Sequence, residues 1–110
     1  MTTIIFEKSG DSYRSMICMG HAGHKRFHFE EDIVCASISV LVINTINGLE
    51  RFTDTKFKVQ TNEETGFIRC DFLSSLSSEA MVLMDTLVLG LSDISRQYGE
   101  KYCVLEFKEV

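Results

Sequence analysis

The stretch "DIVCASISVLVINTINGLERF", from Asp32 to Phe52, decides the fold. The stretch is about twenty residues long and has no breaker before Gly48, a length that favours a helix, although its many Val and Ile residues would also suit a buried strand. Asp32 is a favourable N-cap residue for such a helix. Because the stretch is apolar on nearly every side, we expect the helix to be covered by a sheet and also by a second subunit.

Segments of alternating polarity lie on both sides of this helix. Upstream, the β-forming segments 2–8 and 13–20 flank the turn signal "SGDS", which predicts a hairpin. Downstream, the alternating segments 56–61 and 66–73 flank "NEETG", which predicts a second hairpin. The chain therefore has one predicted hairpin before the helix and one after it.

A second helix is predicted from Ser77 to Tyr98, where either of two adjacent serines can cap the start and Gly99 supplies a stop. Gly90 inside this helix suggests close packing, and residues 101–108 form a last alternating strand. The apolar face of the helix has helical spacing and comprises Met84, Leu87, Val88, Leu91 and Ile94 or Ser95.

The order of these elements is β-β-α-β-β-α-β. It predicts an α+β fold in which two helices pack on a small, mostly antiparallel sheet. The chain has 110 residues, no proline, no repeat and no low-complexity linker, so we expect a single domain over residues 1–110.

Composition excludes several classes of protein. A formal charge of −5 argues against direct binding of nucleic acid, which requires clustered Lys and Arg. The N-terminus lacks the features of a signal peptide, and we expect no apolar run to approach the ~20 residues of a membrane span. In a chain without a secretion signal, the four cysteines are expected to be free thiols, and Cys18, Cys70 and Cys103 are expected to be small core residues.

The residues between Gly20 and Ser39 carry the candidate chemistry. If Asp32 caps the helix, Cys35 lies in the first turn, where the helix dipole and unpaired N–H groups favour a thiolate and could hold an oxyanion. His21 lies at the end of a predicted strand, from which it could act as a base toward Cys35. Ser39 is four residues beyond Cys35 and so lies on the same helix face.

Two other interpretations of this stretch remain open. Cys35 could be a buried small hydrophobe and His21 a surface histidine. Alternatively, His21, His24 and His28 together with Cys35 could ligate zinc, although this spacing is not a recognised two-plus-two pattern. We expect no metal and no cofactor, with His24 and His28 on a solvated, mobile loop.

Two separated blocks resemble the signature of the ribosomal-processing cysteine proteases, the Prp family. The first is "GHA" at Gly20–Ala22, and the second is "DIVCASIS" at Asp32–Ser39, similar to the family's DIVCAAVS. The length and the element order also resemble that family, so the resemblance spans the domain. The loop between the blocks is longer than in typical members, and Glu30 stands where many members have a glycine.

The resemblance implies a bacterial, cytoplasmic and homodimeric endopeptidase without a cofactor. It would remove the short N-terminal extension of a large-subunit ribosomal protein, with Cys35 as nucleophile and His21 as base. Gly20, Asp32 and Ser39 would support the site, and apolar substrate residues would meet Phe27, Phe29 and a Met-rich face. The alternative is a non-catalytic, ribosome-associated binding or chaperone module on the same fold.

Overall fold

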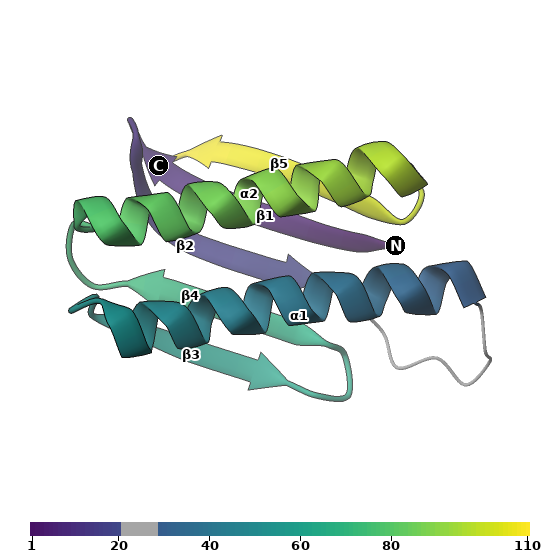
Figure 1. Cartoon of the computed structure of the whole chain (residues 1–110), viewed down its shortest axis with the longest axis horizontal. Helices are drawn as coiled ribbons and strands as arrows, with labels where there is room; N and C mark the ends of the chain where they lie inside the picture. Colours follow the sequence, from purple (N-terminus) through teal and green to yellow (C-terminus); the bar gives the residue numbers. More distant parts are fainter. Residues whose placement is uncertain (21–28) are drawn as a thin grey trace.

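A computed structural model describes residues 1–20 and 29–110, apart from the Phe29 side chain. The chain forms one five-stranded sheet covered on one face by two helices (Figure 1). This confirms the predicted α+β class and the order β-β-α-β-β-α-β. The elements are β1 (Thr2–Ser9), β2 (Ser12–Met19), α1 (Phe29–Phe52), β3 (Phe57–Asn62), β4 (Phe67–Phe72), α2 (Ser78–Tyr98) and β5 (Cys103–Glu109).

The strands lie side by side in the order β3-β4-β2-β1-β5. The hairpins β1–β2 and β3–β4 and the pair β2–β4 are antiparallel, whereas β1 and β5 are parallel. The sheet is therefore mostly antiparallel, as predicted, and its one parallel pair joins the first strand to the last. That pairing places Thr2 opposite Cys103, beside the start of α1 (Figure 1).

The core lies between the sheet and the two antiparallel helices. Ile4 and Phe6 of β1 and Val42 of α1 are completely buried, as are Met84 and Leu91 of α2. An added Cβ at Gly90 would lie 3.0 Å from Cδ1 of Leu41 in α1, so the glycine allows α1 and α2 to approach closely. The expected close packing at Gly90 is confirmed. The predicted core positions Cys18, Cys70 and Cys103 are also confirmed, because all three are buried.

Helix ends were predicted with unequal success. Ser77 caps α2 by accepting a hydrogen bond from the backbone N–H of Ala80, and Gly99 ends the helix at a φ of 103°, both as predicted. Helix α1, in contrast, begins at Phe29, so the prediction that Asp32 is its N-cap is wrong. Its first turn holds Glu30, Glu31 and Asp32, where carboxylates interact favourably with the helix dipole.

Helix α1 is also more apolar than the sequence analysis anticipated. By length and composition alone, Glu30–Phe52 meets the criterion for a membrane span, so the expectation that no run approaches that length is wrong. In this fold, Val34 and Ile38 of the same helix are buried in the core. The core helix of a globular domain can pass the same test, so its length and composition do not show that α1 spans a membrane.

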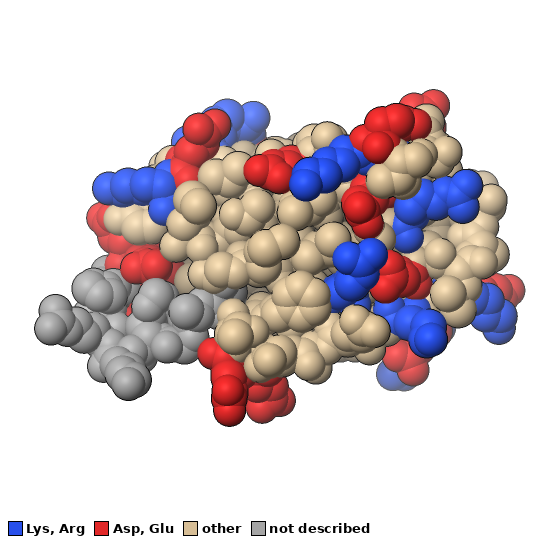
Figure 2. All heavy atoms as spheres, turned by 180° about the vertical axis from the view of Figure 1, so that it is seen from behind, with Lys and Arg blue, Asp and Glu red and all other residues tan. Residues whose placement is uncertain are grey.

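The opposite face of the sheet combines apolar and charged side chains. Ile5 and Ile17 are both buried there. Arg69 of β4 pairs with Asp71 through Nε, 3.0 Å from Oδ2, and with Glu7 of β1 at 3.4 Å. Figure 2 shows this face as a broad uncharged surface interrupted and bordered by charged side chains.

Candidate active site

The end of β2 lies against the start of β1 through a glycine. Gly20 has a φ of 80°, a conformation that only glycine adopts readily, and an added Cβ would lie 2.5 Å from the backbone carbonyl oxygen of Met1. The same added atom would lie 3.8 Å from the Cα of Thr2. Any side chain at position 20 would therefore strain the backbone and push against β1.

Cys35 lies in the second turn of α1, with its side chain directed into the molecule. Its side chain is buried, with a relative exposure of 6% compared with 2% for Cys18 and 0% for Cys70. Since α1 begins six residues before Cys35, the amide of Cys35 is not one of the unpaired N–H groups of the first turn. The expectation that Cys35 lies in the first turn of the helix is wrong.

Thr2 contacts the sulfur of Cys35. Its hydroxyl Oγ1 lies 3.8 Å from Sγ, within the reach of a hydrogen bond to sulfur, and the Thr2 side chain is fully buried. The Thr2 backbone is fixed because its N–H donates to the carbonyl of Tyr102 at 2.8 Å. This contact could not be predicted from the sequence, because it depends on the pairing of the first strand with the last and no local pattern signals that pairing.

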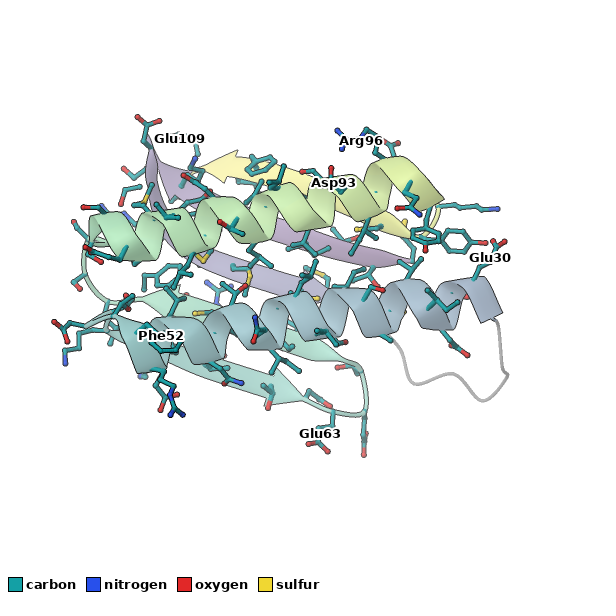
Figure 3. The ribbon with its side chains drawn as sticks, in the orientation of Figure 1. Glu30, Phe52, Glu63, Asp93, Arg96 and Glu109 are labelled. Atoms are coloured by element: carbon teal, nitrogen blue, oxygen red, sulfur yellow. The ribbon has the colours of Figure 1, made fainter. Side chains whose placement is uncertain are left out.

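Two polar contacts attach the first turn of α1 to the neighbouring strand ends. The hydroxyl of Tyr102 donates to Glu30 at 2.9 Å, and the amino group of Met1 lies 3.3 Å from Glu31. Glu30 is seen at the start of α1 in Figure 3, close to the turn that leads into β5. These contacts fix the part of α1 that carries Cys35 relative to β1 and β5.

Burial raises the pKa of the Cys35 thiol, and the hydrogen bond from Thr2 acts in the opposite direction. The negative charges of Glu31 and Asp32 raise that pKa further. The described residues therefore hold Cys35 as a neutral thiol at neutral pH, contrary to the expectation that the helix start lowers its pKa. A nucleophilic role requires a base that removes the proton.

Three of the cysteines lie around this point of the sheet. Cys103 pairs in register with Thr2, and Cys18 pairs with Ile4 two residues further along β1. Burial raises the pKa of Cys18 to about 12 and that of Cys103 to about 11, and a negative charge on Cys35 would raise both further. Their thiols are thus inert as nucleophiles, which leaves Cys35 as the candidate in this group.

The other predicted site residues lie partly inside and partly outside the described structure. Asp32 and Ser39 are half-buried on α1, one turn before and one turn after Cys35. His21 lies outside the described residues, so its distance from Cys35 is not defined. The same holds for the other two histidines of the zinc hypothesis; within residues 1–20 and 29–110, no three His, Cys, Asp or Glu side chains gather as a metal site.

A groove of about 410 Å³ runs along α1 beside Ser39. Its second wall is the β3–β4 hairpin, which contributes Val59, Phe67 and Ile68. Of the methionines expected to meet the substrate, Met16 and Met84 are buried in the core whereas Met1 is exposed, so the Met-rich face stays a prediction. The expected contact with Phe27 falls outside the described residues. Apolar side chains that could meet a ligand therefore lie in this groove.

A family model described as cysteine protease Prp matches residues 1–103 of this chain. The chain is similar to the essential ribosomal processing protease Prp from S. aureus, solved in complex with a substrate peptide: the TM-score is 0.88 at 21% identity, covering 98% of this chain and 100% of that chain.

A second solved structure of the S. aureus protease, with a covalently linked product peptide, has a TM-score of 0.83 at 21% identity and the same coverage. SMU.848 from Streptococcus mutans has a TM-score of 0.86 at 22% identity, covering 100% of this chain and 99% of that chain. At these identities the structural likeness shows the fold alone. No sequence among the curated proteins matches the chain.

Proposed function

The chain belongs to the cysteine protease Prp family, and from that premise we propose that it is an endopeptidase that removes the N-terminal extension of a large-subunit ribosomal protein. The related S. aureus protein is a ribosomal processing protease that was solved with a substrate peptide. A bacterial, cytoplasmic enzyme acting on a peptide during ribosome maturation fits this family. The net charge of −5 also suits a peptide better than a nucleic acid as the bound partner.

One observation carries the proposal most directly: the sulfur of Cys35 lies against the Thr2 hydroxyl and one helical turn from a groove. Of the four thiols, Cys35 has the largest exposed fraction. A cysteine nucleophile must be reached by a peptide carbonyl, and it must be held in one orientation. The contact with Thr2 supports a fixed orientation of the Cys35 sulfur, and its exposed fraction, the largest of the four thiols, supports its accessibility to a peptide.

We assign His21 as the base on the basis of the raised thiol pKa and the sequence motif. Because burial and the neighbouring carboxylates oppose a standing thiolate, the proton must be removed as the reaction proceeds. Gly20, the residue before His21, packs against Met1 and Thr2, and Thr2 in turn contacts Cys35.

The reaction then follows the usual course of a cysteine protease. His21 accepts the thiol proton, and the thiolate sulfur of Cys35 attacks the scissile carbonyl carbon to form a tetrahedral intermediate. The intermediate expels the amine, which takes the proton from His21, and leaves an acyl-enzyme at Cys35. Water attacks this thioester, releases the second product and regenerates the thiol.

Incubation with the full-length ribosomal protein from the same genome tests the proposal, with any cut mapped by mass spectrometry. Wild type is expected to remove a short N-terminal peptide, and both Cys35→Ala and His21→Ala are expected to lose at least about a thousandfold in rate. Cys70→Ala is the matched control, because Cys70 is a buried strand residue on β4 and should leave cleavage intact. Full cleavage by Cys35→Ala would refute the assignment and favour a non-catalytic binding module.

We also propose that the protein is a homodimer. The helices expose apolar side chains on the side away from the sheet, and Val40, Val82 and Leu89 have relative exposures of 66%, 61% and 62%. Solvent-exposed apolar side chains gathered on one helical layer are typical of a protein interface. The expectation that a second subunit covers α1 depends on this surface.

A further inference from the structure

The groove beside α1 has the size and lining of a peptide subsite. Its volume of about 410 Å³ lies within the range of ligand pockets. Apolar side chains from both walls form most of its lining, among them Ile43 and Ile46 of α1 and Val59 of β3. A side chain of a bound peptide could bury its apolar surface between these walls.

The groove and the candidate nucleophile occupy one face of the same helix. Cys35, Ser39 and Ile43 are spaced four residues apart on α1, a spacing that aligns side chains along one side of a helix. With a rise of 1.5 Å per residue, Ile43 lies about 12 Å along the helix axis from Cys35. An extended peptide advances about 3.3 Å per residue, so a residue in the groove would stand about four positions from the scissile bond.

Glu63 is a charged residue that lines the groove, and it is seen at the tip of the β3–β4 hairpin (Figure 3). Within the part of the chain that the structure describes, Glu63 forms no ion pair with Lys or Arg. The neighbouring residue, Glu64, adds a second carboxylate to the same turn. The rim is therefore negative beside an apolar interior, which is complementary to a ligand that is both apolar and cationic.

We propose that this groove binds the substrate at about the fourth residue from the scissile bond, and that it selects an apolar side chain next to a Lys or Arg. In an extended peptide, adjacent side chains point in opposite directions. The apolar side chain enters the groove, and its cationic neighbour points outward, from where a long, flexible Lys or Arg side chain can bend back to Glu63 at the rim. The inference rests on the proteolytic function proposed above, and it adds the place and chemistry of substrate selection.

Binding to the inactive Cys35→Ala protein tests the subsite separately from catalysis. The probe is a fluorescein-labelled peptide that spans the ribosomal-protein extension, together with versions in which each apolar residue is replaced by Ala and each basic residue by Glu. Fluorescence anisotropy gives the dissociation constant of each version. One Ala replacement and one adjacent Glu replacement are expected to weaken binding far more than the others.

Ile43→Asp is expected to weaken binding more than tenfold, because a carboxylate would then lie inside the apolar groove. Asn44→Asp is its matched control: Asn44 is exposed on the same helix, does not line the groove, and should leave binding unchanged. Glu63→Lys is expected to weaken binding about three- to fivefold, the range for an exposed ion pair. Binding by Glu63→Lys should recover with the peptide in which the adjacent basic residue is Glu.

The outcomes separate the subsite from the protease. If wild type cleaves the peptide but neither Ile43→Asp nor Glu63→Lys changes its binding, the subsite is wrong and the proteolytic function stands. If both variants change binding as expected but wild type cleaves nothing, the subsite stands and the protease is wrong. If Ile43→Asp alters only the sedimentation coefficient of the protein, the groove is an interface between two copies, and the subsite is overturned.

Discussion

Replacing Thr2 by Val tests whether the hydroxyl beside Cys35 tunes the thiol. The substitution preserves the shape of a fully buried side chain and the backbone hydrogen bond from position 2 to Tyr102, and it removes only the group that contacts Sγ. That hydrogen bond lowers the pKa of Cys35 against the effect of burial. Its loss should therefore raise the pKa of the thiol.

The size of this shift follows from the hydrogen bond. If the bond stabilises the thiolate over the thiol by about 1 kcal/mol, its removal raises the pKa of Cys35 by an amount equivalent to that free energy. Below the pKa, the thiolate fraction at a given pH then falls about fivefold. Reaction with iodoacetamide, which requires the thiolate, should slow by about the same factor.

The assay is the rate of Cys35 alkylation between pH 6 and pH 10, measured by mass spectrometry of the peptide that contains Cys35. Thr2→Ser retains the hydroxyl and is the control, so its midpoint should stay close to that of wild type. The melting temperature should not fall in Thr2→Val, because the new methyl group is apolar and the side chain at position 2 is fully buried. A midpoint that is the same in Thr2→Val and wild type would refute the reasoning.

Three further predictions concern stability and assembly. Gly20→Ala should lower the free energy of unfolding by more than the ~1–2 kcal/mol of backbone strain, because its Cβ also meets the Met1 carbonyl. Gly10→Ala, with open space around its Cβ, should lower the free energy of unfolding by the strain alone. Urea unfolding measures both variants, and equal losses would contradict the close approach at Gly20. Burial raises the pKa of the Cys70 thiol from 9.0 to about 12, so the neutral thiol contributes its full stability below pH 9, and this contribution is lost as the pH rises toward 12. In urea unfolding between pH 9 and pH 12, Cys70→Ala should lose less free energy of unfolding than wild type. An equal loss in the two proteins would disprove the contribution of Cys70. Leu89→Glu should shift the sedimentation coefficient toward that of a monomer. Gln60→Glu, at an exposed position of β3 and not on the helical layer, should leave it unchanged, and a wild type that is already monomeric would rule out the dimer.

Local patterns in the sequence were sufficient to predict most of the fold. Alternating polarity located both hairpins, and helical spacing located the buried face of α2, because these signals depend only on neighbouring residues. Ser77 and Gly99 marked the ends of α2 for the same reason. The start of α1 was missed by four residues, Ile33 instead of Phe29, because acidic side chains favour both the N-cap and the first turn, so Asp32 gave no unique signal.

The candidate site was predicted less completely than the fold. The motif pointed to Cys35 on α1, but the pKa of its thiol depends on burial and on charges around it, which a helix-start argument does not include. The contact from Thr2 depends on a parallel pairing between β1 and β5, and the groove depends on where α1 lies over the β3–β4 hairpin. Such contacts join distant segments, and no local pattern in one sequence reveals them.

The parallel pairing of β1 with β5 also has a consequence for the order of synthesis. Thr2 emerges from the ribosome among the first residues, but the carbonyl that fixes its backbone belongs to Tyr102, just before the last strand. Domains form only after their strands are available to pair, and pairing across nearly the whole chain is slow. A nascent chain therefore carries Cys35 for most of its translation without the neighbours that orient its sulfur. Such a protease would remain inactive until its own translation is complete.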